Sequence, residues 1–417
     1  MHLIYCLVIQ MDPLNRVITF DLSIMENSVE GVPSPNMPTR LPPSPSSHPQ
    51  ILCVNPANLS ANSQVQGILT SSCAICPRMI QYECEECRAV SYCSTEHAKL
   101  HECSHREACL KVYESSQRVE MLKNHLLCRV PNPFRHRIGQ FWAMPETSEY
   151  LQEMSNLVEL LGSVPHCTAI KRCLTLTFHV MYFGGIDRQS FRFRIPALMM
   201  RIDRDQECYD FMKWRSKSHD RDRLSKLSLE TMRVRFANPI ATGARIISED
   251  NFTGYIGENI FEPIEEFDQG TSIMTLIPLC LLKIRFLFEV QRMNLAVQAF
   301  DSRFPNEILD KIVRNIPTTK KISENKELVE NPFVRLGAMQ TLLGQILQLY
   351  RQIHSLNPYV WKGMVWAKRG DARRGNVDPQ WLTWDMQTYV KNNWESWIET
   401  PGAIPLLMRI MAEVGHT

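Results

Sequence analysis

The chain has 417 residues, enough for more than one domain, and 44% of them are hydrophobic, as in globular proteins. Its 46 basic and 44 acidic residues leave a net charge of +2. This balance excludes a general electrostatic attraction to nucleic acids or membranes, so neither is expected as a direct partner.

The first 70 residues predict a tether. The apolar run at 1–12 lacks the basic start of a signal peptide, and it predicts a short strand or a stretch upstream of a start at Met11 or Met25. Residues 27–70 are rich in Pro, Ser and Asn. Such a composition cannot bury enough apolar surface to offset chain entropy, so residues 1–70 are expected to be largely disordered. A proline-rich tether can also serve as an SH3 or WW ligand.

The cysteines are unevenly distributed. Seven of the 14 lie within residues 73–109 together with histidines, and the other seven are scattered singly. Clustering of this kind is typical of zinc binding in a reducing compartment, whereas disulfide frameworks spread through small secreted domains. We therefore expect an intracellular protein, nuclear or cytoplasmic and not secreted. The scattered cysteines are predicted to be buried small hydrophobic residues.

Eight residues in this segment have metal-ligand spacing: Cys73, Cys76, Cys84, Cys87, Cys93, His97, His105 and Cys109. Zinc prefers four thiolate or imidazole ligands in a tetrahedron, so eight ligands complete two sites. Closed sites of this kind hold structure and leave no open position for a substrate. Because the segment contains few apolar residues, two Zn²⁺ ions are expected to supply most of its folding energy.

The spacing resembles the MYND zinc finger over its whole length, and residues 91–94 match the YCS element of that family. The resemblance implies a cross-brace in which one ion is held by Cys73, Cys76, Cys93 and His97, and the other by Cys84, Cys87, His105 and Cys109. His97 replaces a cysteine found in many members and preserves the ligand chemistry.

Other positions depart from the family pattern. Ala98 and Glu102 stand where peptide-binding members carry Gln and Trp, so the resemblance does not extend to the peptide groove. His101 and Cys103 do not fit the spacing and are predicted to lie outside the ligand set.

The chain after the finger predicts a mainly α fold. Apolar residues recur at the 3.6-residue period, and Pro and Gly mark the ends of segments. Helices are predicted over residues 110–128, about 145–164, 168–182, 189–202, 205–216, 272–300, 305–315, 332–355, 379–398 and 403–414. We therefore expect a finger at 71–110 and, over 111–417, an all-helical domain that is irregular or stacked like a solenoid. The run at 273–290 carries Lys283, Arg285 and Glu289, which predict a buried helix and not a membrane span.

The phrase RDQECYDF at 204–211 resembles one in a group of fungal MYND-finger proteins with a large helical region of undefined activity. Its carboxylates, which include Asp205 and Asp210, leave acid–base chemistry geometrically open. The simpler interpretation is a helix N-terminus, with Asp205 as the cap, paired with Arg204 or Lys213. Cys208, Phe211 and Trp214 would then pack inward.

Two further features have competing interpretations. Six of the eight tryptophans lie within 361–397, where they could stack bases, but their helical spacing favours a core. The basic stretch at 213–235 could bind phosphate, but its interspersed acidic residues favour a solvated face.

Together these patterns predict a zinc-binding adaptor or scaffold that binds protein partners through its finger. A transcriptional or translational regulator acting in a complex is an alternative. A protein-lysine methyltransferase is a further one, because some MYND fingers are inserted in SET domains. The chain contains no SET cofactor motif and its helical pattern contradicts that fold, so we do not expect an enzyme.

Overall fold

The computed structural model describes residues 9–11, 18–20, 69, 71–184, 191–217, 257–267, 272–300, 303–367 and 384–414. The chain divides into two compact units, residues 1–64 and 65–417. In the first unit, β1 (Ile9–Met11) pairs antiparallel with β2 (Ile18–Phe20). Apart from β1, β2 and residue 69, the segment 1–70 that is predicted to be disordered lies outside the described residues, as does most of the basic stretch at 213–235.

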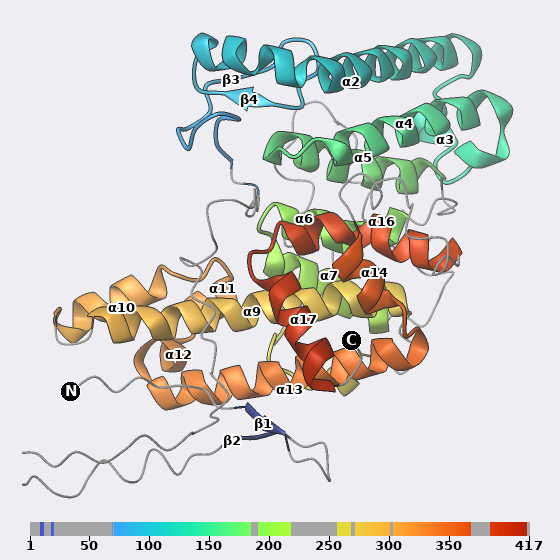
Figure 1. Ribbon diagram of the computed structural model, residues 1–417. Coiled ribbons are helices and arrows are strands. Elements are labelled where there is room, and N and C mark those ends of the chain that lie inside the picture. Colours follow the sequence, from blue (N-terminus) through green and yellow to red (C-terminus); the bar gives the residue numbers. More distant parts are fainter. Residues whose placement is uncertain are drawn as a thin grey trace, which may run out of the picture. The chain divides into compact units, whose positions relative to one another are not determined.

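The second unit begins with a small β-hairpin, β3 (Tyr82–Glu83) and β4 (Ser91–Tyr92), and continues as helices (Figure 1). The prediction of a mainly α fold is confirmed. The described helices are α2 (Thr95–Arg129), α3 (Pro133–His136), α4 (Pro145–Ser163), α5 (Cys167–Gly184), α6 (Ile195–Arg201), α7 (Asp205–Lys217), α9 (Ile273–Phe300), α10 (Asn306–Arg314), α11 (Lys320–Ser323), α12 (Lys326–Glu330), α13 (Pro332–Leu356), α14 (Val360–Trp366), α16 (Trp384–Ile398) and α17 (Ala403–Val414). Short 3-10 turns occur at Phe141–Ala143, Phe191–Phe193 and Ile264–Glu266.

Most of the long helices lie where the periodicity places them, but two boundaries differ. α2 begins at Thr95 and not near Leu110, because Ser94 caps it by accepting a hydrogen bond from the backbone N–H of His97. The helix predicted from residue 189 is wrong at its start, since a 3-10 turn precedes α6 and Pro196 occupies the first turn of that helix. The short helices α11, α12 and α14 carry too little periodicity to be predicted.

The core of the helical region forms around α9. Nearly every side chain from Met274 to Val290 is buried, and α9 packs against α13, α10, α7, α16 and α17. Lys283, Arg285 and Glu289 are among the buried residues, as the prediction of a buried helix requires. Among the described helices a solenoid-like stack is not seen, because α9 contacts helices distant in sequence. None of these described helices has the length and hydropathy needed to cross a membrane.

A second group of helices adjoins the finger. α2 packs along α4, and α4 packs along α5. The predicted finger boundary at residue 110 falls inside α2, which runs without interruption from the finger into this group (Figure 1). One helix, α2, is therefore shared by the finger and by the group that it forms with α4 and α5.

Burial tests the predictions for tryptophan and cysteine. Trp361 and Trp397 are fully buried and Trp394 is nearly so, as expected for a core, but Trp366 is 59% exposed. Trp381 lies outside the described residues. Of the scattered cysteines, Cys128 is exposed, so its predicted burial is wrong. The others within the described residues are buried: Cys167, Cys173, Cys208 and Cys280.

Candidate metal centre

The structure brings all eight predicted ligands together in two groups of four. The first cluster is Cys73, Cys76, Cys93 and His97, and the second cluster is Cys84, Cys87, His105 and Cys109. Within each cluster the donor atoms all lie within 4.8 Å of one another. This is the interleaved division that the spacing and the resemblance imply.

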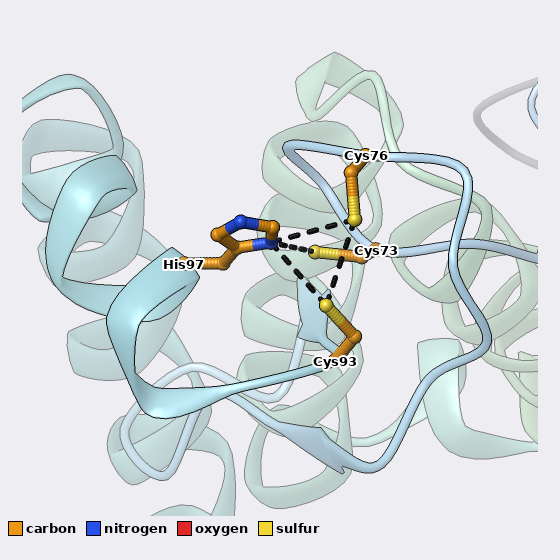
Figure 2. Close-up of side chains that lie close together, drawn as sticks. All are labelled: Cys73, Cys76, Cys93 and His97. Carbon is orange, nitrogen blue, oxygen red and sulfur yellow. Dashed lines mark hydrogen bonds between the residues drawn. The ribbon is translucent and has the colours of Figure 1, made fainter.

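Figure 2 shows the first cluster, in which the ring of His97 projects from the start of α2 toward three sulfurs. Its Nδ1 atom lies 3.5 Å from Sγ of Cys73, 3.4 Å from Sγ of Cys76 and 3.3 Å from Sγ of Cys93. The sulfurs of Cys76 and Cys93 are 3.5 Å apart. A zinc tetrahedron with ordinary bond lengths has edges of about 3.6 Å between sulfur and nitrogen and about 3.8 Å between sulfurs. The first cluster therefore fits a zinc ion.

The second cluster has similar dimensions. Sγ of Cys87 lies 3.2 Å from Nε2 of His105, and Sγ of Cys84 lies 3.7 Å from Sγ of Cys109. Glu86 lies beside this cluster, where its carboxylate accepts a hydrogen bond from Cys109 at 3.2 Å. The donor set is again three thiols and one imidazole, which is typical of a structural zinc site.

The backbone forms the tight turns that zinc knuckles need. The first knuckle is the turn that carries Cys73 and Cys76, and the second knuckle is the turn that carries Cys84 and Cys87. In the second knuckle the N–H of Arg88 donates to the carbonyl of Cys84, and the N–H of Ala89 donates to Sγ of Cys87. Arg88 has a φ of 52°, in the left-handed region that such a reversal requires. In the first knuckle the N–H of Cys73 donates to the carbonyl of Arg78.

α2 supplies ligands to both clusters. The Ser94 cap fixes the first turn and so fixes His97, while His105 and Cys109 follow on the buried face of the same helix. His97 and His105 are separated by eight helical steps, or about 12 Å along the axis. The spacing of the two clusters is thus set by a rigid rod.

Burial and hydrogen bonds shift the pKa values of the cluster side chains in different directions. Burial opposes ionisation of Cys73, but hydrogen bonds from the backbone of Ile75 and Cys93 and from His97 lower the pKa of its thiol to about 6. Burial and the neighbouring thiols raise the pKa of Cys93 to about 11. Burial also lowers the pKa of His105, which favours the neutral ring that a metal binds. A divalent cation would relieve the repulsion between the thiolates.

His101 has a place that the ligand spacing does not reveal. Its ring stacks on His105 with centroids 5.3 Å apart, and its Nδ1 lies 3.1 Å from the hydroxyl of Tyr92. Since Tyr92 precedes Cys93, this pair connects the two clusters. The recurrence of His97, His101 and His105 at four-residue steps on one helix face is a signal that could have indicated this arrangement. Cys103 is exposed and belongs to neither cluster.

The start of α5 packs against the finger. Nε2–H of His166 donates to the carbonyl of Ser72 at 3.2 Å, and the hydroxyls of Ser91 and Thr168 are 2.7 Å apart. Arg172 donates from Nη1 to the carbonyl of Cys87 at 2.6 Å. Contacts from α5 thus reach the segments that carry the ligands of both clusters.

The carboxylates of the RDQECYDF phrase are engaged in structural contacts. Asp205 is the first residue of α7, and its carboxylate accepts a hydrogen bond from Arg285 of α9 at 2.6 Å. Asp210 accepts hydrogen bonds from the backbone N–H groups of Gly257 and Glu258 at 2.8 and 2.9 Å. Burial, opposed by Arg285, raises the pKa of Asp205 to about 6. Asp205 is only 3% exposed.

The predicted inward packing of this phrase is confirmed for Cys208 and Phe211, which are buried, while Trp214 is half-buried. The predicted pairing of Asp205 with Arg204 or Lys213 is wrong. Arg204 instead pairs with Glu207, and Lys213 pairs with Glu262 at 2.6 Å. Arg285 is 80 residues from Asp205 in sequence, so no local pattern indicates this pairing.

Comparisons with protein-family models, with curated proteins and with solved structures found no match to this chain. What the sequence and the structure define is a mainly helical protein with a small module whose two Cys/His clusters could each bind a metal ion.

Proposed function

We propose that this chain is a zinc-binding adaptor for protein partners, with residues 73–109 as a MYND-type finger that holds two Zn²⁺ ions. The observation that carries the proposal is the sorting of the eight predicted ligands into two groups of four with tetrahedral dimensions. Three thiolates and one imidazole favour zinc over harder divalent ions, which prefer oxygen ligands. When bound, zinc would neutralise the thiolates and join the two knuckles to α2.

The proposed recognition surface is a group of exposed apolar side chains beside the first cluster. Ile75 lies between two ligands of that cluster and is 44% exposed, and Met79 follows the same knuckle at 87% exposed. Leu100, at 71% exposed, lies one turn after His97 on α2. Exposed apolar groups on a rigid frame suit a partner segment with apolar side chains. Because the ligands hold the knuckle, this surface depends on the metal.

The proposal assigns no reaction to the chain. The carboxylates of Asp205 and Asp210, which could have served acid–base chemistry, bind Arg285 and the backbone of Gly257 and Glu258. This supports a scaffold over an enzyme. A reducing intracellular compartment suits the many free cysteines. A regulator acting within a complex would use the same surface, and the identity of its captured partners would distinguish that role from a general adaptor.

The test is affinity capture with the full chain. Cys76→Ser and Met79→Glu should each lose the specific partners, the first by releasing the zinc ion of the first cluster and the second by placing a charge on the surface. Cys103→Ser is the matched control, since Cys103 is exposed and outside both clusters, and it should retain them. Identical partner sets for all variants would refute the adaptor role. Methyl transfer from S-adenosylmethionine to a histone peptide array would establish the methyltransferase alternative.

A further inference from the structure

The outer face of α2 carries a regular row of exposed side chains. The helix buries its opposite face through residues such as Val112, Ser115 and Leu126. On the outer face, residues recur at alternating steps of four and three, which keeps them on one side of a helix. This α2 outer row consists of Cys103, Glu107, Leu110, Glu114, Gln117, Met121, Asn124 and Cys128, all of which are exposed.

The order of side-chain types in the row is the same from either end. Each end has a cysteine, Cys103 or Cys128, followed inward by a polar residue and then by a large apolar one, Leu110 or Met121. Leu110 is 53% exposed and Met121 is 61% exposed. An interface with two-fold symmetry places the same surface of each copy against the other, so the surface must be self-complementary. A row that reads alike from both ends meets this condition when the helices are antiparallel, because apolar positions then meet apolar positions and polar positions meet polar ones.

We propose that the α2 outer row binds a second copy of this chain, with the two α2 helices antiparallel. Leu110 then packs against Met121 of the second copy at two symmetric positions. Cys103 lies beside Cys128 of the second copy at both ends of the contact. His105 and Cys109, two of the predicted ligands on α2, are buried on the other face, and His97 precedes the row, so the contact leaves all three undisturbed.

The charges in the row select this orientation. Parallel helices would place Glu107 against Glu107 and Glu114 against Glu114 of the second copy, and like charges at such distances repel. The antiparallel register places Glu107 opposite Asn124 and Glu114 opposite Gln117, whose amides can donate hydrogen bonds to a carboxylate. Within its own chain Glu107 also pairs with Lys111 at 2.6 Å.

The size of the row sets the expected strength. About 25 helical steps separate Cys103 from Cys128, so the row is about 38 Å long. A single strip of this length, half of it polar, is at the small end of specific interfaces. We therefore expect a dimer that dissociates in the micromolar range.

The first experiment uses the two cysteines as a ruler. The zinc-loaded full chain is treated with a bis-maleimide linker of about one helix diameter, roughly 10 Å, and the linked peptides are mapped. We expect a link between Cys103 and Cys128. One chain cannot make it internally, because its own two cysteines lie about 38 Å apart on a rigid helix. Cys103→Ser alone and Cys128→Ser alone should lose the link, and an equimolar mixture of the two variants should recover it.

The second experiment measures mass by sedimentation against protein concentration. Leu110→Glu and Met121→Glu should each remain monomeric, with zinc content and far-ultraviolet circular dichroism unchanged. Leu127→Glu is the matched control, because Leu127 is 48% exposed on the same helix but outside the row, and it should still dimerise. A wild-type chain that is monomeric up to about 100 µM would overturn the proposal. So would links between Cys103 and Cys103, or a dimer that Leu110→Glu leaves intact.

Discussion

Nη1 of Arg172 donates a hydrogen bond to the backbone oxygen of Cys87 at 2.6 Å, and Nη2 of the same guanidinium donates to the hydroxyl of Ser116 at 3.2 Å. One side chain of α5 thereby joins the second knuckle to α2. Together with the uninterrupted α2, this contact binds the finger to the helices that follow it.

Replacing Arg172 should therefore weaken the whole unit. Arg172→Ala removes two hydrogen bonds made by a charged, half-buried group and leaves the carbonyl of Cys87 without this donor. We expect the free energy of unfolding to fall by about 2 kcal/mol. Arg118→Ala, whose side chain is 61% exposed, should cost less than about 1 kcal/mol. Urea unfolding of the zinc-loaded proteins measures both, and equal losses would contradict the role given to Arg172.

Metal content should follow the division into clusters. The wild-type chain is expected to bind two zinc ions. Cys84→Ser should reduce the content to one, because the second cluster loses a thiolate while the first cluster keeps all four ligands. Cys103→Ser should leave the content unchanged. Mass spectrometry of the purified proteins gives the stoichiometry, and a loss of both ions from Cys84→Ser would show that the clusters fold as one unit.

Removal of zinc should affect more than the finger. The sequence predicts that a chelator unfolds residues 71–110 and leaves the helical remainder largely folded. The contacts of His166, Thr168 and Arg172 extend this expectation to the first turns of α5. Amide hydrogen exchange should therefore accelerate in the finger, in the first half of α2 and near residues 167–172, but not in α9 or α13. Unchanged exchange in residues 71–110 would refute the metal dependence.

Removing a buried charge from the helical core should strongly lower the free energy of unfolding. Arg285 donates to Asp205 at 2.6 Å and to Asp203 at 3.1 Å, and its side chain is 5% exposed. Arg285→Ala leaves these carboxylates without their partner and should cost roughly 3–5 kcal/mol. Arg409→Ala removes a half-exposed pair with Glu413 and should cost under about 0.5 kcal/mol. Thermal unfolding distinguishes the two, and similar melting temperatures would be evidence against the Arg285 network.

Acid should destabilise the chain through His179. Burial lowers the pKa of His179 to about 4 from an ordinary value of 6.5. The unfolded state therefore binds the proton first, so stability is full above the unfolded pKa and declines as pH falls toward the folded pKa. This residue should account for roughly 2 kcal/mol of the loss between about pH 7 and about pH 5.

His179→Gln isolates that contribution. Glutamine does not titrate, so the variant should lose less stability than the wild type over the same pH interval, whatever its stability at neutral pH. Urea unfolding at both pH values gives the two differences. Parallel pH dependences for variant and wild type would mean that His179 does not titrate as described.

How far the sequence predicts this structure depends on the range of each interaction. The start of α2 follows from Ser94, a local cap, whereas the apolar period that predicts the helix becomes visible only near Leu110. The two clusters follow from spacing within 37 residues and a strict ligand chemistry. The ligand spacing does not indicate the position of His101, because it has no place for a ring that stacks on the predicted ligand His105.

The sequence by itself determined the eight candidate ligands and their division, the helical class and the position of most long helices. These depend on residue type and on spacing along a few turns. Only the tertiary structure decided that Arg285 meets Asp205, that Arg172 reaches Cys87, and that the outer row of α2 is exposed while its other face is buried. The two pairings join residues 80 and 85 positions apart in sequence, and the exposure of the row depends on which helices cover α2. Both depend on how the helices pack, which no local pattern encodes.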